Sequence, residues 1–298
     1  MQGFTAFKYV GAERAVQCLE DGTLYLASPD QLNDALEARF STAGAEGYLA
    51  TVEATLAEVA RQRDEPPLSL SRDALPEFSD VNQQENERFQ AFCEGIGICA
   101  LAKRPNHQAM WAYYGEGGEG VCLELTLPSK VMKTHQLLAG PVTYCDAPRV
   151  FNRADDWRTT FLELAEQYPK ATTQDLQRMS LEETFRRRMG LRMAQRATSV
   201  KHPDWAHEDE IRLLGPKGRT PLPILGQVLT RVHFQSIKAL SRVAPLLVKH
   251  YPDVRFMQWT FDHGELQAQG QPMELKLVPA DGKGPAISPA DLARSHKS

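Results

Sequence analysis

The sequence predicts one mixed α+β domain over residues 1–280, followed by a flexible tail over 281–298. Strand-like runs are distributed along the whole chain, which favours a single mixed domain over separate all-α and all-β parts. Two long helical stretches, at about 43–95 and 150–200, interrupt these runs as insertions. The tail is rich in Gly, Pro and Ser, a composition typical of a loosely held chain end.

The chain opens with a strand, a short helix and a second strand. Phe4–Val10 is rich in aromatic and β-branched residues and predicts the first strand. Glu13–Glu20 places apolar residues at helical spacing, and Gly22 suits the left-handed conformation that ends a helix. Thr23–Ser28 predicts the second strand, which Pro29 terminates.

The next segments continue the mixed pattern. Asn33-Asp34 predicts a turn, and the Pro- and Ser-rich stretch Asp64–Asp80 predicts a loop that could form a lid. Helices are predicted at Ala43–Arg63, Val81–Gly95, His107–Tyr114 and Ser236–Tyr251. Strands are predicted at Ile96–Lys103, Val121–Leu127, Pro141–Cys145, Ile224–Phe234, Phe256–Phe261 and Met273–Val278.

The stretch Trp205–Arg212 is unusually charged and runs into the apolar Leu213–Leu214. Read as a strand, it places Glu208, Glu210 and Arg212 on one face. A charged row that enters a buried strand is costly unless the charges are paired or used. Two interpretations follow: an edge strand with a structural Glu–Arg pair, or a catalytic carboxylate at a strand entrance.

Composition excludes several classes of protein. The net charge of −4 argues against a strongly basic nucleic-acid-binding protein, so such contacts would need a local patch. The basic run Arg186–Arg196 offers one, although such runs are usually solvated helix faces. Five scattered cysteines without a C-x-x-C pair, no signal peptide and no membrane-length apolar run predict a cytoplasmic protein.

Three other patterns predict ordinary structure. Gly115–Gly120 lacks a following Gly-Lys-Ser/Thr and predicts a turn, not a phosphate loop. His202 and His207 are five residues apart with Pro203 between them, so no metal site is expected. Trp111 and Tyr114, three apart on a helix, are typical core residues, and no nucleophile elbow is present.

Four blocks, taken in order, resemble one bacterial family. They are Phe7–Tyr9 with Leu19–Pro29; Leu32–Asp34; Met110–Tyr114 with Gly120–Glu124; and Trp205 with Glu208, Glu210 and Arg212. This combination is similar to the bacterial domain of unknown function 2971 (DUF2971) over roughly residues 5–265. The chain departs from the family pattern at Asp34-Ala35, where the family usually has Asp-Pro, and Glu37 would supply the acid that follows. The family name implies no activity.

The opening unit also resembles the start of the ADP-ribosyltransferase fold, which implies a mixed, mainly antiparallel sheet core. In that fold a first-strand residue contacts NAD, a second strand carries a Tyr or Ser, and a late strand carries a catalytic Glu. Lys8 or Tyr9, Tyr25 with Ser28, and Glu208 or Glu210 follow the same order. The first-strand residue of that fold is usually His or Arg, so Lys8 is a departure.

The resemblance implies an NAD-dependent enzyme that modifies a macromolecular target, protein or nucleic acid, in a toxin or phage-defence setting. Glu210 is the first choice for the catalytic acid, with Glu208 next to it. A carboxylate there would stabilise the oxocarbenium-like state formed when the glycosidic bond of NAD breaks. The residues assigned to NAD are Lys8, Tyr9, Tyr25, Ser28, Tyr113 and Arg212.

Two other classes of function stay open. The polar cluster could be structural in a non-catalytic module that binds protein or nucleic acid through Arg186–Arg196. Alternatively, Asp34, Glu37 and Glu210 could hold a divalent metal in a nuclease.

Overall fold

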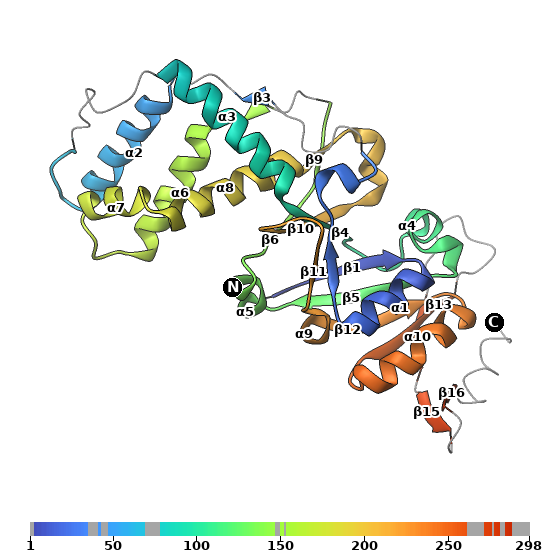
Figure 1. Cartoon of the computed structure of the whole chain (residues 1–298). Helices are drawn as coiled ribbons and strands as arrows, with labels where there is room; N and C mark the ends of the chain where they lie inside the picture. Colours follow the sequence, from blue (N-terminus) through green and yellow to red (C-terminus); the bar gives the residue numbers. More distant parts are fainter. Residues whose placement is uncertain are drawn as a thin grey trace. The chain divides into compact units, whose positions relative to one another are not determined.

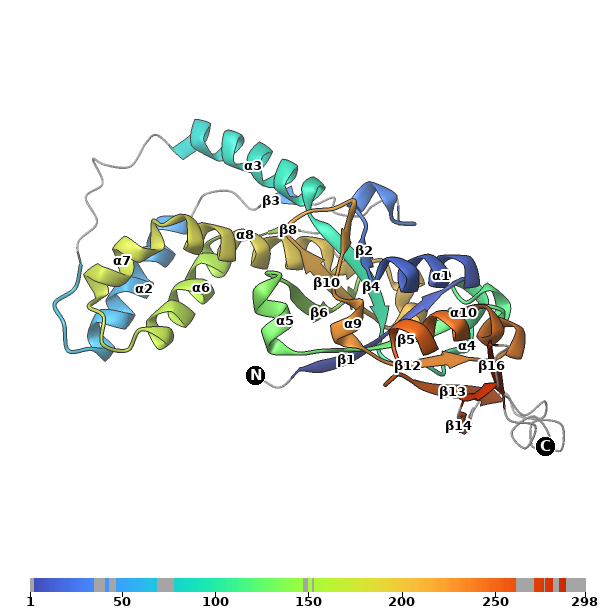
Figure 2. The same ribbon diagram turned by 60° about the horizontal axis from the view of Figure 1, so that its bottom comes forward.

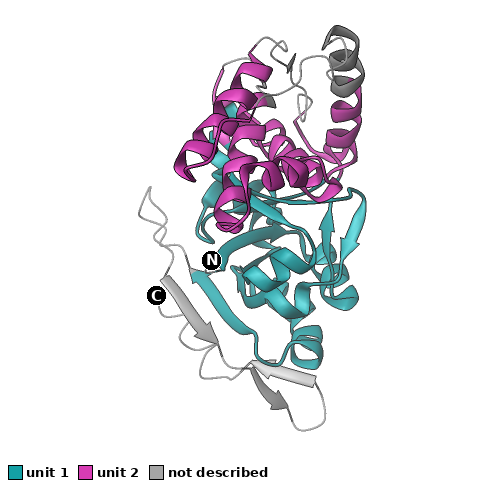
Figure 3. Cartoon of the chain, turned by 90° about the vertical axis from the view of Figure 1, so that its left-hand side faces the viewer, with its two compact units in different colours: residues 1–27, 97–142, 204–298 teal, residues 28–96, 143–203 magenta. Residues whose placement is uncertain are grey.

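The computed structural model describes residues 3–34, 41–42, 47–68, 78–146, 150–151, 153–260, 271–275, 277–280 and 284–287. The chain forms two compact units (Figure 3). Unit 1 comprises residues 1–27, 97–142 and 204–298, and unit 2 comprises 28–96 and 143–203. The prediction of a single domain over 1–280 stays a prediction.

Unit 1 is built on an eight-stranded sheet (Figure 1). Its order is β14 (Gln271–Leu275), β13 (Arg255–Thr260), β12 (Leu229–Phe234), β5 (Val121–Leu127), β1 (Phe4–Val10), β4 (Gly97–Ala102), β10 (Glu210–Gly215) and β6 (Leu138–Pro141). All neighbours are antiparallel except β12 and β13. The predicted α+β class with a mixed, mainly antiparallel sheet is therefore confirmed.

One face of this sheet carries the main core of unit 1. Helices α1 (Ala12–Asp21) and α10 (Ile237–His250) lie side by side against it (Figures 1 and 2). The short helices α5 (Ser129–Thr134) and α9 (Leu225–Val228) add Val131, Leu225 and Val228. From the sheet, Ala6, Leu123 and Leu213 complete this aliphatic face, because side chains alternate along each strand.

The other face carries aromatic and polar side chains. Helix α4 (Gln108–Tyr113) packs Met110 and Trp111 against Tyr9, Cys122 and Trp259. After α4 comes the 3₁₀ helix η3 (Glu116–Gly118), within the predicted glycine-rich turn. An antiparallel pair of strands distant in the sequence, β2 (Leu24–Leu26) with β11 (Thr220–Leu222), lies in the same unit.

Unit 2 has its own helical core. It contains α2 (Tyr48–Gln62), α3 (Phe78–Gly95), α6 (Arg153–Gln167), α7 (Thr173–Ser180) and α8 (Glu183–Thr198). Two short strand pairs belong to it, β3 (Ser41–Thr42) with β8 (Val150–Phe151) and β7 (Thr143–Tyr144) with β9 (Val200–Lys201). Leu56, Phe161 and Leu176 are fully buried at its centre. These helices fall within the stretches 43–95 and 150–200 that the sequence marked as helical.

Three predicted strands are wrong in detail. Ile224–Phe234 begins as helix α9 and becomes β12 only at Leu229. Pro141–Cys145 is split at Val142, so that β6 pairs with β10 and β7 pairs with β9. Met273–Val278 spans parts of two strands, β14 and β15 (Leu277–Ala280).

Several predictions fall on parts of the chain that the structure does not describe. Glu37, most of the predicted lid at 64–80, and the tail at 281–298 lie outside the described residues, apart from 64–68, 78–80 and strand β16 (Gly284–Ile287). Among the described residues no helix is long and apolar enough to cross a membrane.

Candidate functional site

The strand register decides which predicted site residues share a face. Glu210 lies opposite Ala102, Ala102 lies opposite Phe7, and Phe7 lies opposite Glu124. Paired residues of antiparallel strands point to the same side, and so do residues two apart on one strand. Tyr9, Glu124, Glu210 and Arg212 therefore share the face beneath α4, here called the polar face.

Lys8 lies on the opposite side of the sheet. It is paired with Leu123 of the aliphatic core, and its Nζ donates to the Ala100 carbonyl at 2.9 Å. The structure thus does not bring Lys8 and Glu210 together on one face. Of the two first-strand candidates, Tyr9 shares a face with the glutamate.

Glu210 and Arg212 form a buried ion pair. The Arg212 Nε donates to Glu210 Oε1 at 2.9 Å, and its terminal nitrogen lies 3.5 Å from Oε2. Arg212 is fully buried and Glu210 is 3% exposed. The Glu–Arg pair expected from the charged stretch is present, and the guanidinium offsets much of the negative charge of Glu210.

Glu208 does not lie on the strand. Pro203–Glu208 is a 3₁₀ helix, η4, and β10 begins only at Glu210. Asp209, between them, has a left-handed backbone with φ of 44° and pairs with Lys103 at 2.6 Å. The prediction that Glu208, Glu210 and Arg212 lie on one strand face is therefore wrong for Glu208, because Asp209 interrupts the alternation.

The Glu208 carboxylate is held by a tyrosine. Glu208 is buried, 4% exposed, and accepts a hydrogen bond from Tyr114 Oη at 2.5 Å. Such short O–H···O⁻ contacts are typical of charge-assisted hydrogen bonds. Tyr114 directly follows α4, so this helix fixes the position of the carboxylate.

Tyr9 organises the loop that leads into α4. Its hydroxyl donates to the Arg104 carbonyl at 2.8 Å and accepts from the His107 backbone N–H at 3.1 Å. Its ring meets Trp111 edge-on, 5.1 Å between ring centres. Burial raises the pKa of the Tyr9 phenol far above its usual value, so the group stays neutral. His107 Nδ1 is buried without a hydrogen-bond partner among the described residues.

Three aromatic rings flank Glu208 or its hydrogen-bond partner in the sequence: Trp205 and His207 precede Glu208, and Tyr113 precedes Tyr114. The Tyr113 side chain is 72% exposed, and its ring lies 5.7 Å from that of His207. The Trp205 ring stacks on the His207 ring, with 6.2 Å between the ring centres. Exposed aromatic rings next to a buried carboxylate suit a ligand that has both a flat ring and positive charge.

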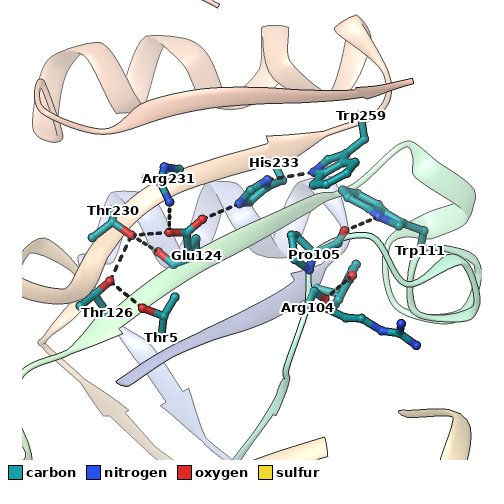
Figure 4. Close-up of polar contacts among 11 residues, drawn as sticks. Thr5, Arg104, Pro105, Trp111, Glu124, Thr126, Thr230, Arg231, His233 and Trp259 are labelled. Atoms are coloured by element: carbon teal, nitrogen blue, oxygen red, sulfur yellow. Dashed lines mark hydrogen bonds and ion pairs between the residues drawn. The ribbon is translucent and has the colours of Figure 1, made fainter. Parts of the chain in front are cut away.

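A second polar cluster lies on the same face, further along the sheet (Figure 4). Glu124 accepts from Arg231 at 2.5 Å and lies 2.9 Å from His233 Nε2. Trp259 Nε1 donates to His233 Nδ1 at 2.9 Å. An indole N–H can only donate, so Nδ1 must accept and Nε2–H points to Glu124.

The electrostatics of Glu124 favour its charged form. Burial raises the pKa of its carboxyl, but the hydrogen bond from His233, together with Arg231 and Thr230, outweighs burial and leaves the pKa below its ordinary value. Both ring nitrogens of His233 are used within the cluster. We therefore interpret this cluster as structural: its hydrogen bonds fix the side chains of β5, β12 and β13 on the polar face.

Tyr25 and Ser28 lie elsewhere. Tyr25, on β2, packs under the Arg14 guanidinium of α1, 5.0 Å from its ring centre, beside a pocket of about 200 Å³ lined by Cys18 and Asp21. Ser28, in unit 2, caps the 3₁₀ helix η1 (Pro29–Gln31), with its Oγ donating to Asp30 at 2.5 Å. The roles assigned to these two residues stay predictions.

The basic run on α8 is partly neutralised. Arg188 and Arg192 both pair with Glu163 of α6, and Arg196 pairs with Asp156. No group of three or more His, Cys, Asp or Glu side chains that could hold a metal occurs among the described residues. Asp34, of the alternative metal site, belongs to unit 2 and Glu210 to unit 1.

The sequence by itself does not identify the Glu124–His233 cluster. A signal existed, because Glu124 is a lone carboxylate within the apolar run Val121–Leu127 and needs a partner when buried. Its partner His233 is 109 residues away, so the sequence indicates that Glu124 needs a hydrogen-bond partner but does not identify that partner.

Comparison with known proteins supports one of the resemblances. Residues 110–213 match the model of a family described as protein of unknown function (DUF2971). This range holds the third and fourth blocks, with Trp111, Tyr114, Glu124, Glu208 and Arg212, so the resemblance is confirmed there. No curated protein and no solved structure matches the chain.

Proposed function

We propose that the protein is an NAD-dependent, ADP-ribosyltransferase-like enzyme that modifies a macromolecular target, with Glu208 as the carboxylate that faces the ribose. The observation that carries the proposal is the position of Glu208. It is held by Tyr114 at 2.5 Å, and the exposed rings of Tyr113 and His207, which precede Tyr114 and Glu208 in the chain, lie 5.7 Å apart.

The proposed chemistry needs a negative charge that is fixed in place. Breaking the bond between nicotinamide and ribose creates positive charge on the ribose, which a pre-oriented carboxylate stabilises. The same carboxylate can accept the proton of the incoming nucleophile. Tyr113 and His207 would stack on the nicotinamide or adenine ring.

Glu208 is preferred over Glu210 for a physical reason. The Arg212 guanidinium, fully buried beside Glu210, compensates its charge and occupies its oxygens at 2.9 and 3.5 Å. Glu208 instead lies at the end of η4, next to His207, whose ring meets the exposed Tyr113 ring, and accepts a hydrogen bond from Tyr114 Oη at 2.5 Å. In this proposal the Glu210–Arg212 pair fixes the start of β10 and so positions Glu208.

The cellular setting is part of the same proposal. All five cysteines are unpaired, four of them buried, which supports a reducing, cytoplasmic compartment. A bacterial toxin or phage-defence role would fit an enzyme that consumes NAD.

The test is nicotinamide release and transfer of labelled ADP-ribose from NAD in the presence of bacterial extract. Glu208→Gln is expected to lower the rate by about 100-fold or more. Glu94→Gln, an exposed glutamate of α3, serves as the matched control and is expected to leave the rate unchanged. Glu210→Gln is expected to lower the melting temperature as well, because it breaks a buried pair.

Two outcomes would overturn the proposal. One is the absence of nicotinamide release with every extract together with no thermal shift by NAD. The other is full activity in Glu208→Gln protein that melts like the wild type.

A further inference from the structure

A groove on unit 2 lies outside the site described above. It runs between α3 and α8 and has a volume of about 430 Å³. From α8 it is lined by Arg186, Met189, Gly190 and Met193, which follow the spacing i, i+3, i+4, i+7 of one helix face. Seven residues of helix give the groove a length of about 10 Å on this side.

The groove combines an apolar floor with a basic rim. Phe89 and Phe92 of α3 and Met189 and Met193 of α8 form the floor. Arg88, Arg186 and Arg187, all exposed, stand along the rim, with Glu183 as the one acid among the lining residues. Phe, Met and Arg are enriched in protein–protein interfaces, and methionine adapts its shape to a partner.

The arginines of α8 divide into two groups. Arg188, Arg192 and Arg196 face α6 and are paired with Glu163 and Asp156. Arg186 and Arg187 instead line the groove, where Arg186 donates to the Leu181 carbonyl at 2.7 Å. The Leu181 side chain, at the end of α7, is 64% exposed. Arg186 and Arg187 thus place their positive charge at the groove, whereas the other three arginines meet the acids of α6.

Gly190 adds an independent observation. It lies inside α8, where glycine weakens a helix relative to alanine. Its packing does not require glycine, because a Cβ there would meet Phe92 only at an ordinary contact of 3.6 Å. A glycine on a groove wall lets another chain approach the helix backbone closely.

We propose that the α3–α8 groove binds an acidic amphipathic helix, two to three turns long, of a partner protein. The apolar stripe of that helix would cover Phe89, Phe92, Met189 and Met193, and its Asp or Glu side chains would meet Arg88, Arg186 and Arg187. Charge complementarity selects this partner over a basic one. A nucleic acid would use the arginines but leave the apolar floor uncovered.

The test uses the full chain and a fluorescein-labelled 18-residue peptide with Leu at i, i+3, i+4 and i+7 and Glu elsewhere on the helix. Fluorescence anisotropy is expected to show saturable binding that weakens with salt. A peptide of the same composition with the stripe scrambled, and one with Lys in place of Glu, are expected to bind at least about tenfold more weakly, the loss that 1.4 kcal/mol represents.

Two variants separate the parts of the groove. Arg186→Ala/Arg187→Ala removes two of the three rim arginines, and Gly190→Leu fills the groove from its α8 wall; each is expected to weaken binding about tenfold or more. Arg178→Ala, an exposed arginine of α7 in the same unit, is the matched control and should bind like the wild type. Thermal melts establish that each variant is folded.

The result can contradict the proposal in two ways. Absence of binding by the striped acidic peptide to the wild type would overturn it. So would binding of a 20-nucleotide RNA or DNA that is lost in Arg186→Ala/Arg187→Ala but unchanged in Gly190→Leu, because the groove would then act as a phosphate site. Nicotinamide release does not enter this test, so its outcome is independent of the proposed enzyme activity.

Discussion

Individual side chains of the polar face are satisfied by partners that are distant in the sequence. Tyr114 and Glu208 are 94 residues apart, and Glu124 and His233 are 109 apart. Each buried carboxylate receives donors that offset the cost of its desolvation. These contacts explain how unit 1 tolerates buried glutamates both on its sheet, at Glu124 and Glu210, and at the end of η4, at Glu208.

Tyr114→Phe tests the contact that positions Glu208. The change removes a hydrogen bond to a buried carboxylate and is expected to lower the unfolding free energy by roughly 1.5–3 kcal/mol. Tyr113→Phe, at the exposed neighbouring position, is expected to change it by no more than about 0.5 kcal/mol. Urea unfolding measures both, and equal effects in the two variants would contradict this account.

Glu124 is expected to contribute to acid sensitivity. Its folded pKa lies below its ordinary value of about 4.3, because the His233 and Arg231 contacts outweigh burial. Its stabilisation is therefore complete above the unfolded pKa and is lost as the pH falls through the folded pKa. At pH 7 the unfolding free energy of the wild type should exceed that of Glu124→Gln by roughly 1.5–3 kcal/mol. Urea unfolding should show this difference shrinking below about pH 4. A difference that does not change with pH would show that the cluster does not stabilise the ionised form of Glu124.

At the scale of elements, the junction between η4 and β10 sets which glutamate faces which way. Asp209 alone separates Glu208 from Glu210, and its left-handed backbone turns the chain between them. Asp and Asn tolerate this conformation better than branched residues.

Asp209→Val is expected to destabilise the protein by about 1–2 kcal/mol more than Asp209→Asn, since valine is strained at positive φ. Both variants lose the pair with Lys103, so their difference isolates the backbone. Asp209→Val should also lower nicotinamide release by displacing Glu208. Urea unfolding and the release assay measure the two effects, and equal values for the two variants would show that the backbone conformation is unimportant.

Helix α8 should become more stable when Gly190 is replaced by alanine. The unfolding free energy of the protein without a partner is expected to rise by about 0.5–1 kcal/mol, because alanine is the better helix former and its Cβ fits against Phe92. Urea unfolding would measure the gain. A loss of stability would instead show that glycine is needed for packing within the unit.

At the scale of the molecule, the two compact units have separate cores. The fully buried Leu123 lies in the core of unit 1, and the fully buried Phe161, stacked on Trp157 with ring centres 4.8 Å apart, lies in that of unit 2. Separate cores favour separate local unfolding.

Phe161→Ala is expected to lower the unfolding free energy by about 3–5 kcal/mol, and Leu123→Ala by about 2–5 kcal/mol. Hydrogen exchange should rise in α2 and α6–α8 with the first variant, and in β1, β5 and β12 with the second. Exchange that rises equally across both units in either variant would show that the chain unfolds as one block.

Local sequence patterns determined much of the element content. Phe4–Val10 and Val121–Leu127 are strands with the predicted bounds, and Gly22 adopts the expected left-handed cap with φ of 65°. These features depend on near neighbours, through alternation, helical spacing and the freedom of glycine. Of the two interpretations of the charged stretch, the structure shows the Glu–Arg pair, but β10 lies between β4 and β6 and is not an edge strand.

The tertiary structure alone decided how these residues combine. Only strand register places Tyr9 with Glu210 and sends Lys8 to the opposite face. Only the folded chain brings His233 to Glu124 and Tyr114 to Glu208. The physical reason is that these pairings depend on contacts between residues about 100 positions apart in the chain. In addition, the left-handed backbone of Asp209 changes the direction of the chain, and the local sequence pattern does not indicate this turn.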